Sequence, residues 1–208
     1  MRLSDITPTI SRRRLLIGGT AAAALALAGC SQGEVKLENI NGIDLSEVDF
    51  GKDFQLTDTE GKKRTLADFK DNVLLLFFGF TQCPDVCPTA LFRATEVKEL
   101  LGPENAKRVQ VAFITIDPER DTPEVLGSYV HAFDPDFIGL YGTLEETQKT
   151  ARDFKVFYAK VPTGTSYTMD HTALTYVYDT KGKLRLALRH NQTAEEYAED
   201  IRKVLAAA

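Results

Sequence analysis

The chain has 208 residues, 43% of them hydrophobic, which is enough for one well-packed domain and leaves little for a second. Its formal net charge is −5, and it becomes −8 without residues 1–29, which carry four arginines and one aspartate. Such an acidic surface argues against nucleic acid as a partner and against electrostatic docking on anionic lipid.

The N-terminus differs in composition from the rest. Arg12–Arg14 precede an uncharged run of fifteen residues, Leu15–Gly29, which is followed by Cys30. The run is too short to cross a bilayer comfortably, so residues 1–29 are predicted to be an export signal. The arginines resemble a twin-arginine signal, and the ending resembles a bacterial lipoprotein box in which Cys30 is lipidated. A retained membrane anchor is the alternative. Both predict a domain at the periplasmic face of the cell membrane.

Residues 30–49 are polar with weak periodicity, so we predict a flexible tether there and a single domain over residues 50–208. Charge-free runs predict buried strands, and capping boxes at Thr143 and Thr193 predict helix starts. The expected strands are Phe50–Leu56, Lys62–Leu66, Val73–Phe80, Val109–Ile116, Phe137–Tyr141, Val156–Val161, Ala173–Asp179 and Lys183–Arg189. The expected helices are Pro88–Leu101, Thr122–Phe133, Thr143–Asp153 and Thr193–Leu205, with a polar loop over Pro162–Met169.

Cys83 and Cys87 lie between the strand Val73–Phe80 and the helix that follows, at the carboxyl end of a strand, where open α/β sheets place their sites. A helix N-terminus favours thiolate over thiol, and Cys87 is expected to experience this most strongly. The pair can close a disulfide, either redox-active or an inert staple, or bind one metal ion, and the spacing alone does not decide. In an oxidising compartment a reduced pair needs a reductant or a metal.

The order of elements resembles thioredoxin. The predicted fold class is α/β, a thioredoxin-like fold with a central mixed sheet flanked by helices, an N-terminal hairpin and an insertion, Asp134–Asp170, before the final hairpin. In that fold the loop before the final hairpin faces the cysteines, and here this loop carries His171. Two thiolates and an imidazole suit Cu(I), can hold Cu(II) and are also accepted by zinc. His131 and His190 are interpreted as bystanders.

Three segments, Phe80–Pro88, Asp117–Pro123 and Asp170–Thr172, together resemble the Sco (SenC-type) family of copper chaperones for cytochrome oxidase assembly. The resemblance covers about Phe50 to Leu205. It implies a membrane-tethered, thioredoxin-like domain in which Cys83, Cys87 and His171 bind one copper ion. It also implies delivery of copper to the binuclear centre of cytochrome c oxidase subunit II, and a periplasmic copper donor or thiol reductant as a further partner.

Several roles stay open. Asp170 is expected to orient the imidazole of His171, to lie near the metal without binding it, or to be a plain turn residue. Asp117, Arg120 and Asp121 form either a charge cluster at the rim of the site or a turn that starts a helix.

The function has alternatives as well. The main one is a thiol-disulfide oxidoreductase that uses Cys83 and Cys87 as catalytic residues to reduce the acceptor's cysteines, and its activity would survive loss of His171. Whether the protein is an enzyme is therefore open. A thiol peroxidase of the glutathione-peroxidase type would use a tryptophan, which the chain lacks. A structural lipoprotein would not require three potential ligands at one end of a sheet.

Overall fold

The computed structural model describes residues 36–207, and Lys36–Ala208 form one compact unit. The predicted export signal and Cys30 lie outside the described residues. Within the described part, no helix combines the length and the apolar character needed to cross a membrane.

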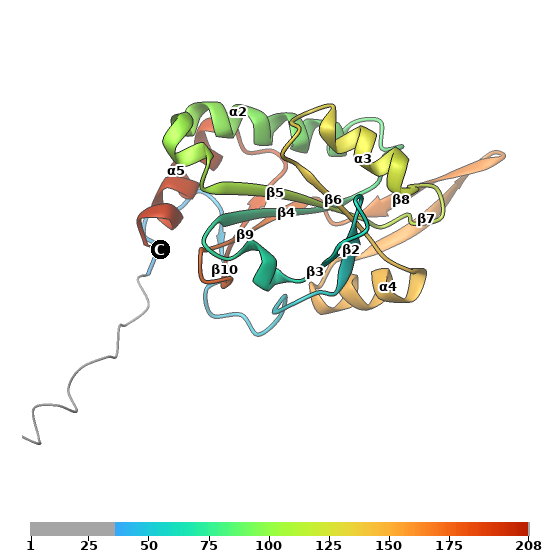
Figure 1. The fold of residues 1–208 in the computed structure, drawn as a ribbon, viewed down its shortest axis with the longest axis horizontal. Helices are drawn as coiled ribbons and strands as arrows, with labels where there is room; N and C mark the ends of the chain where they lie inside the picture. The colour runs from blue at the N-terminus through green and yellow to red at the C-terminus, as the bar shows by residue number, and fades with distance from the viewer. Residues whose placement is uncertain (1–35, 208) are drawn as a thin grey trace, which may run out of the picture. The chain divides into compact units, whose positions relative to one another are not determined.

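The fold is built on an eight-stranded mixed sheet, with a separate two-stranded hairpin that extends away from it (Figure 1). The sheet has the order β1-β10-β9-β4-β5-β6-β2-β3. Its strands are β1 Ile43–Asp44, β2 Leu56–Asp58, β3 Lys63–Arg64, β4 Val73–Gly79, β5 Val109–Thr115, β6 Ile138–Tyr141, β9 Leu174–Tyr178 and β10 Leu184–Arg189. The hairpin consists of β7 Tyr158–Thr163 and β8 Ser166–His171.

The centre of the sheet is made by the two charge-free runs of the sequence. β4 is buried along its whole length, pairs in parallel with β5 and is antiparallel to β9. Strands covered on both faces have no polar face, which explains why these runs do not alternate. The predicted mixed sheet is therefore confirmed. The predicted N-terminal hairpin is also present, although its first strand begins at Leu56 and not at Phe50.

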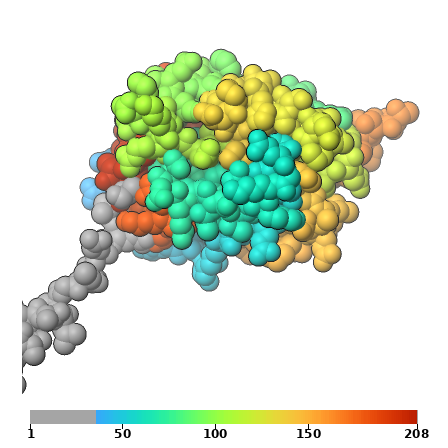
Figure 2. Space-filling model, in the orientation of Figure 1, coloured from blue at the N-terminus to red at the C-terminus, as the bar shows by residue number. Residues whose placement is uncertain are grey.

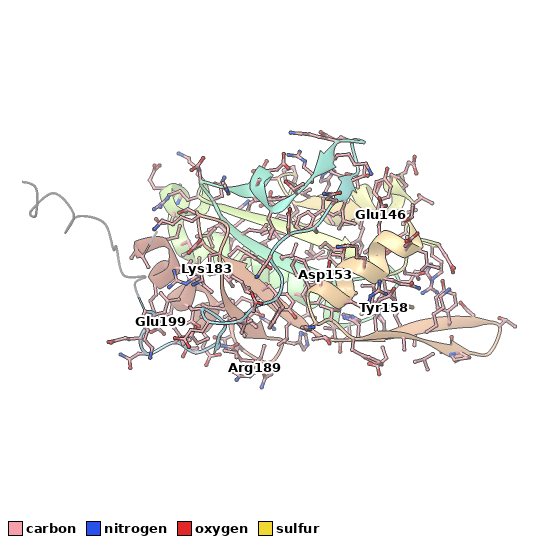
Figure 3. The ribbon with its side chains drawn as sticks, turned by 90° about the horizontal axis from the view of Figure 1, so that it is seen from below. Glu146, Asp153, Tyr158, Lys183, Arg189 and Glu199 are labelled. Carbon is pink, nitrogen blue, oxygen red and sulfur yellow. The ribbon has the colours of Figure 1, made fainter. Side chains whose placement is uncertain are left out.

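Helices cover both faces of the sheet. α2 (Val86–Ala106) and α3 (Pro123–His131) lie over one face, where α2 packs against α5 (Ala194–Ala206) (Figure 1). α4 (Leu144–Asp153) lies on the opposite side, where Figure 3 marks it by Glu146 and Asp153. A single 3₁₀ turn, η1, spans Leu66–Phe69.

Three of the four predicted helix starts are confirmed, and the fourth helix, α2, begins at Val86, two residues before the predicted Pro88. Thr143 and Thr193 each form a complete capping box, and the side chain of Thr122 accepts the N–H of Val125 ahead of Pro123. These caps satisfy amide groups that the helix itself leaves unpaired.

The polar loop predicted over Pro162–Met169 is wrong. This segment completes β7 and forms most of β8, and the two strands pair from Tyr158↔His171 to Thr163↔Ser166 around a turn at Gly164 (Figure 2 shows the hairpin at the edge of the molecule). Pro162 does not exclude a strand here, because a proline is tolerated in an edge strand where its nitrogen faces away from the ladder.

The flexible tether predicted over residues 30–49 is wrong for the part that the structure describes. β1 pairs with β10 through Ile43↔Ala187, and Leu37 is buried against the core. The carboxylate of Asp200 on α5 accepts the backbone N–H groups of Asn41, at 3.0 Å, and Gly42, at 2.8 Å. These contacts join positions far apart in the sequence, so local periodicity does not reveal them.

Replacing Asp200 with alanine is expected to release this segment. Asp200 is fully buried, so the change leaves two amide groups without their acceptor, which costs about 2–4 kcal/mol of unfolding free energy. Urea unfolding measures the loss, and hydrogen exchange should show faster exchange at Asn41 and Gly42. The exposed neighbour Glu199 (Figure 3) accepts only the side-chain amide of Asn41, in an exposed bond, and not the backbone of this segment. It is the matched control, and Glu199→Ala should change stability by less than about 0.5 kcal/mol. Unchanged exchange in the Asp200 variant would contradict the assignment.

Candidate metal centre

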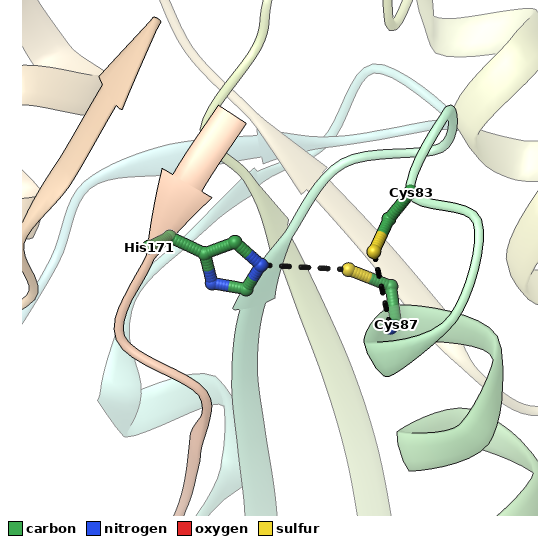
Figure 4. A group of neighbouring side chains, drawn as sticks. All are labelled: Cys83, Cys87 and His171. Atoms are coloured by element: carbon green, nitrogen blue, oxygen red, sulfur yellow. Dashed lines mark hydrogen bonds between the residues drawn. The ribbon is translucent and has the colours of Figure 1, made fainter. Parts of the chain in front are cut away.

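Three side chains converge where β4, α2 and β8 meet (Figure 4). Cys83 lies in the loop after β4, Cys87 in the first turn of α2 and His171 at the end of β8, and their ligand atoms all lie within 4.8 Å of one another. Cys87 Sγ is 3.7 Å from His171 Nε2, and the backbone N–H of Cys87 points at Cys83 Sγ at 3.5 Å. Both cysteines are free thiols. The structure thus brings together the three residues that the sequence predicted.

Gly79, the last residue of β4, makes room for the buried thiol. A Cβ atom at Gly79 would lie 2.7 Å from Cys87 Sγ and 2.8 Å from Phe113 Cζ, closer than real Cβ contacts come. Any other residue would therefore push α2 away from the sheet. Sequence reasoning did not assign this role to Gly79, although a glycine inside a strand is itself a sign of close approach.

The imidazole of His171 is oriented for metal binding. Its Nδ1 lies 3.0 Å from the carbonyl oxygen of Thr172, which can only accept, so the proton is on Nδ1 and the lone pair of Nε2 faces Cys87. The rings of Phe77 and Phe80 meet the imidazole edge to face, with centroids 6.1 and 6.0 Å away. The donor atom is therefore aimed at the thiols.

Asp170 does not orient the imidazole. Successive residues of a strand point to opposite faces, so Asp170, which is exposed opposite Ala159, points away from the face that carries His171. Its carboxylate is not part of the group of potential ligands, and the orienting contact comes from the Thr172 carbonyl.

The thiolate is expected on Cys83, not on Cys87. The hydrogen bond from the Cys87 thiol outweighs the partial burial of Cys83 and lowers its pKa to about 3, helped by the backbone N–H groups of Asp85 and Cys87. The same hydrogen bond, followed by burial, raises the pKa of Cys87. The prediction that the helix N-terminus acts most on Cys87 is therefore wrong: Cys87 is fully buried, and its own amide is directed at Cys83.

This assignment predicts an unusual pH profile. In the metal-free, reduced protein, alkylation of Cys83 by iodoacetamide should change less than about threefold between about pH 5 and pH 8, whereas an ordinary thiol gains nearly three orders of magnitude, because only the thiolate reacts. Peptide mass spectrometry distinguishes the cysteines. Cys87 in a Cys83→Ser variant is the control and should react slowly. A steep rise of Cys83 reactivity toward pH 8 would contradict the assignment.

The segment Asp117–Asp121 serves both roles considered for it. It leads into α3, and Arg120 and Asp121 bond to residues of the loop that carries Cys83. The buried carboxylate of Asp121 accepts the hydroxyl groups of Thr81 and Thr115, both at 2.6 Å, and the N–H of Thr81, and its burial raises its pKa. Asp121 thus fixes the start of the loop formed by residues 80–85, which carries Cys83 and is called the cysteine loop below. His131 and His190 take no part in the group of ligands found among the described residues.

The spacing of the donors fits one ion. Bonds of about 2.3 Å to sulfur and 2.0 Å to nitrogen, the values typical of zinc, place two ligands of one ion about 3.5–3.7 Å apart. The separation of Cys87 Sγ and His171 Nε2 is 3.7 Å. Three soft-to-borderline donors, two of them sulfur, suit Cu(I) and zinc and are unsuited to magnesium or calcium.

Comparisons with known proteins agree with this geometry. The SCO1/SenC family model matches residues 44–206. An SCO2-like protein of Rickettsia felis is 41% identical over 183 residues, which cover 86% of this chain and 88% of the relative. The copper-bound structure of Bradyrhizobium japonicum ScoI has a TM-score of 0.69 and 44% identity, and the match covers 76% of this chain and 100% of that one.

A more distant likeness concerns the fold. BsSco, a member of the Sco family of cytochrome c oxidase assembly proteins, has a TM-score of 0.60 at 23% identity, over 82% of this chain and 98% of its own. The fold is thioredoxin-like, as predicted. The family model covers most of the sequence, and a relative with more than a third of its residues identical aligns along nearly the full length. The chain therefore belongs to the SCO1/SenC family.

Proposed function

We propose that this protein is a copper metallochaperone that holds one copper ion at Cys83, Cys87 and His171 as cargo. One observation carries the proposal: two thiols and an imidazole nitrogen directed at them lie within 4.8 Å of one another. Two sulfur donors favour Cu(I), and the imidazole allows the same site to hold Cu(II). The copper-bound structures of the relatives from Bradyrhizobium japonicum and yeast support copper over zinc.

Release of the ion proceeds by ligand exchange. Cys83 is partly exposed and Cys87 is fully buried, so a donor of the acceptor first displaces Cys83 from the ion and Cys87 leaves last. The hydrogen bond from the amide of Cys87 stabilises the thiolate of Cys83 once it is free. The exchange needs no change in the oxidation state of copper.

The proposed acceptor is the binuclear copper centre of cytochrome c oxidase subunit II, in keeping with the role of the family in assembling that enzyme. A periplasmic copper donor or thiol reductant loads the site. We further propose that residues 1–29 are a twin-arginine-like export signal and that a lipid on Cys30 anchors the domain at the periplasmic face of the cell membrane.

A second candidate function is thiol-disulfide exchange, favoured by the asymmetry of the two thiols. The Cys83 thiolate attacks a disulfide of the acceptor, which forms a mixed disulfide and releases one acceptor thiolate. Cys87 then loses its proton to that thiolate and attacks Cys83 Sγ. The products are a Cys83–Cys87 disulfide and two reduced acceptor cysteines, ready to take copper.

The test compares copper transfer with disulfide reduction. Full-length protein loaded with one equivalent of Cu(I) is mixed with the copper-free, reduced copper domain of subunit II, and with the oxidised domain in a parallel reaction. The chaperone predicts transfer that is lost in His171→Ala. The reductase predicts that His171→Ala still reduces the acceptor disulfide. If the wild-type protein does not bind one copper ion per chain, the proposed chaperone function is wrong.

A further inference from the structure

Arg120 lies between the cysteine loop and the β7–β8 hairpin, which carries His171. Its Nε–H donates to the carboxylate of Asp117, which is almost fully buried. Its Nη1 donates to Gln82 Oε1, at 3.1 Å, and to the backbone carbonyl of Tyr167, at 2.8 Å. Gln82 is adjacent to Cys83 in the cysteine loop, and Tyr167 is on β8. One guanidinium group therefore binds both parts of the metal centre.

Packing strengthens this bridge. The guanidinium carbon of Arg120 lies 3.7 Å from the centroid of the Tyr167 ring, and the Tyr167 hydroxyl donates to Asp117 Oδ1 at 2.8 Å. Arg120, Asp117 and Tyr167 thus form a closed set of contacts, in which the carboxylate fixes both the cation and the ring stacked on it. Because the side chain of Arg120 is only 17% exposed, solvent weakens these contacts little.

The bridge acts on the face of β8 that carries the ligand. Tyr167, Met169 and His171 alternate along the strand and share one face. The Phe80 ring links the two ends of this row, with Arg120 6.0 Å from its centroid on one side and the His171 ring 6.0 Å away on the other. The position of the hairpin relative to the loop therefore sets the distance from His171 Nε2 to the thiols.

Apart from the Phe80–His171 ring contact, the other side-chain bonds of the described hairpin tip do not reach this loop directly. Lys160 and Tyr167 bond to Glu119, and Tyr167 also bonds to Asp117, and both acids lie in the same segment as Arg120. We infer that Arg120 is a positioning residue for the metal centre: it holds the hairpin against the cysteine loop, and so keeps His171 at ligating distance before the metal is bound. The inference rests on the proposed function only for its copper readout.

The first test needs no copper. In the metal-free, reduced full-length chain, the imidazole protons of His171 should show a nuclear Overhauser contact with the β-protons of Cys87, which Arg120→Met should abolish. Methionine keeps much of the length of arginine and removes its donors. Lys160→Met is the matched control, because Lys160 also lies over the Tyr167 ring, at 4.5 Å, but does not reach the cysteine loop. It should keep the contact.

The second test uses copper. Arg120→Met should lower copper affinity about tenfold to a hundredfold, the usual effect of losing a group that orients a ligand, and should give the Cu(II) paramagnetic resonance spectrum of His171→Ala. In the double variant, Arg120→Met should add no further loss, because its effect passes through His171. Lys160→Met should keep the wild-type spectrum and affinity.

A third variant separates geometry from charge. Arg120→Lys keeps the cation beside Asp117 but cannot span Gln82 and Tyr167 with one planar group, so it should resemble Arg120→Met. It also replaces Arg120→Met if that variant does not fold. A wild-type contact and spectrum in Arg120→Lys would show that charge alone suffices and overturn the inference, as would a retained contact in Arg120→Met. If the wild type shows the contact but binds no copper, only the proposed function fails.

Discussion

Replacing Cys87 with serine is expected to abolish stoichiometric copper binding. The change removes the buried sulfur donor and leaves a hydroxyl group, which is a poor ligand for a soft ion, 3.7 Å or more from the remaining imidazole nitrogen. The affinity for Cu(I) should fall by more than the roughly hundredfold loss that follows changes to residues supporting a ligand. Competition with a Cu(I) chelator of known affinity, together with metal analysis of the purified protein, measures the loss.

The control for this variant places the same hydroxyl group elsewhere on α2. Ala94 is buried on the inner face of the helix and has no part in the group of ligands, so Ala94→Ser carries a similar cost in packing but should bind copper as the wild type does. Wild-type affinity in Cys87→Ser would mean that copper is held elsewhere, and the Cys2His site would have to be abandoned.

Replacing Gly79 with alanine is expected to damage stability and copper binding together. The new methyl group would overlap Cys87 Sγ and the Phe113 ring, both of which lie under 3.0 Å from its position, and neither is the far end of a flexible chain. Overpacking of this kind costs about 1–3 kcal/mol of unfolding free energy. Because relief requires α2 to move, the thiol leaves its place opposite His171. Urea unfolding of the metal-free protein and copper titration give the two values.

The control for Gly79→Ala is a glycine that is equally crowded but lies away from the metal centre. Gly139 on β6 is equally crowded, with a Cβ position 2.8 Å from Leu126, but it lies two strands from β4. Gly139→Ala should destabilise the protein by a similar amount and leave copper affinity unchanged. In a Cys87→Ala background, the stability cost of Gly79→Ala should shrink, since one of the two colliding groups is gone. Equal costs in both backgrounds would show that Cys87 is not the obstacle.

The parts of the fold that were predictable are those specified by local chemistry. The charge-free runs around Leu76 and Ile114 are strands, because only an element covered on both faces tolerates them. Thr143 and Thr193 begin helices because their hydroxyl groups accept amide groups three residues on. Each of these depends on neighbours in the sequence, and each was confirmed within a few residues.

The parts that were missed depend on contacts between distant residues. β1 forms because β10 and Asp200 offer partners about 150 residues away, which no local pattern of a polar segment reports. In the site, the identity of the ligands followed from residue type and resemblance. The sequence did not predict that Cys83 is the thiolate, because the pKa of Cys83 depends on its contact with the buried Cys87 thiol and on the direction of the Cys87 backbone N–H.

The β7–β8 hairpin also bears on aggregation. A two-residue turn makes Thr163 and Ser166 a hydrogen-bonded pair, so the backbone groups of Pro162 and Tyr167 face outward from the two edges. Pro162 has no N–H to offer a further strand, and the Tyr167 carbonyl is already occupied by Arg120. Each edge is therefore blocked near the exposed tip. If copies of the protein are crowded together on a membrane, their hairpins cannot pair at this tip to form an intermolecular sheet.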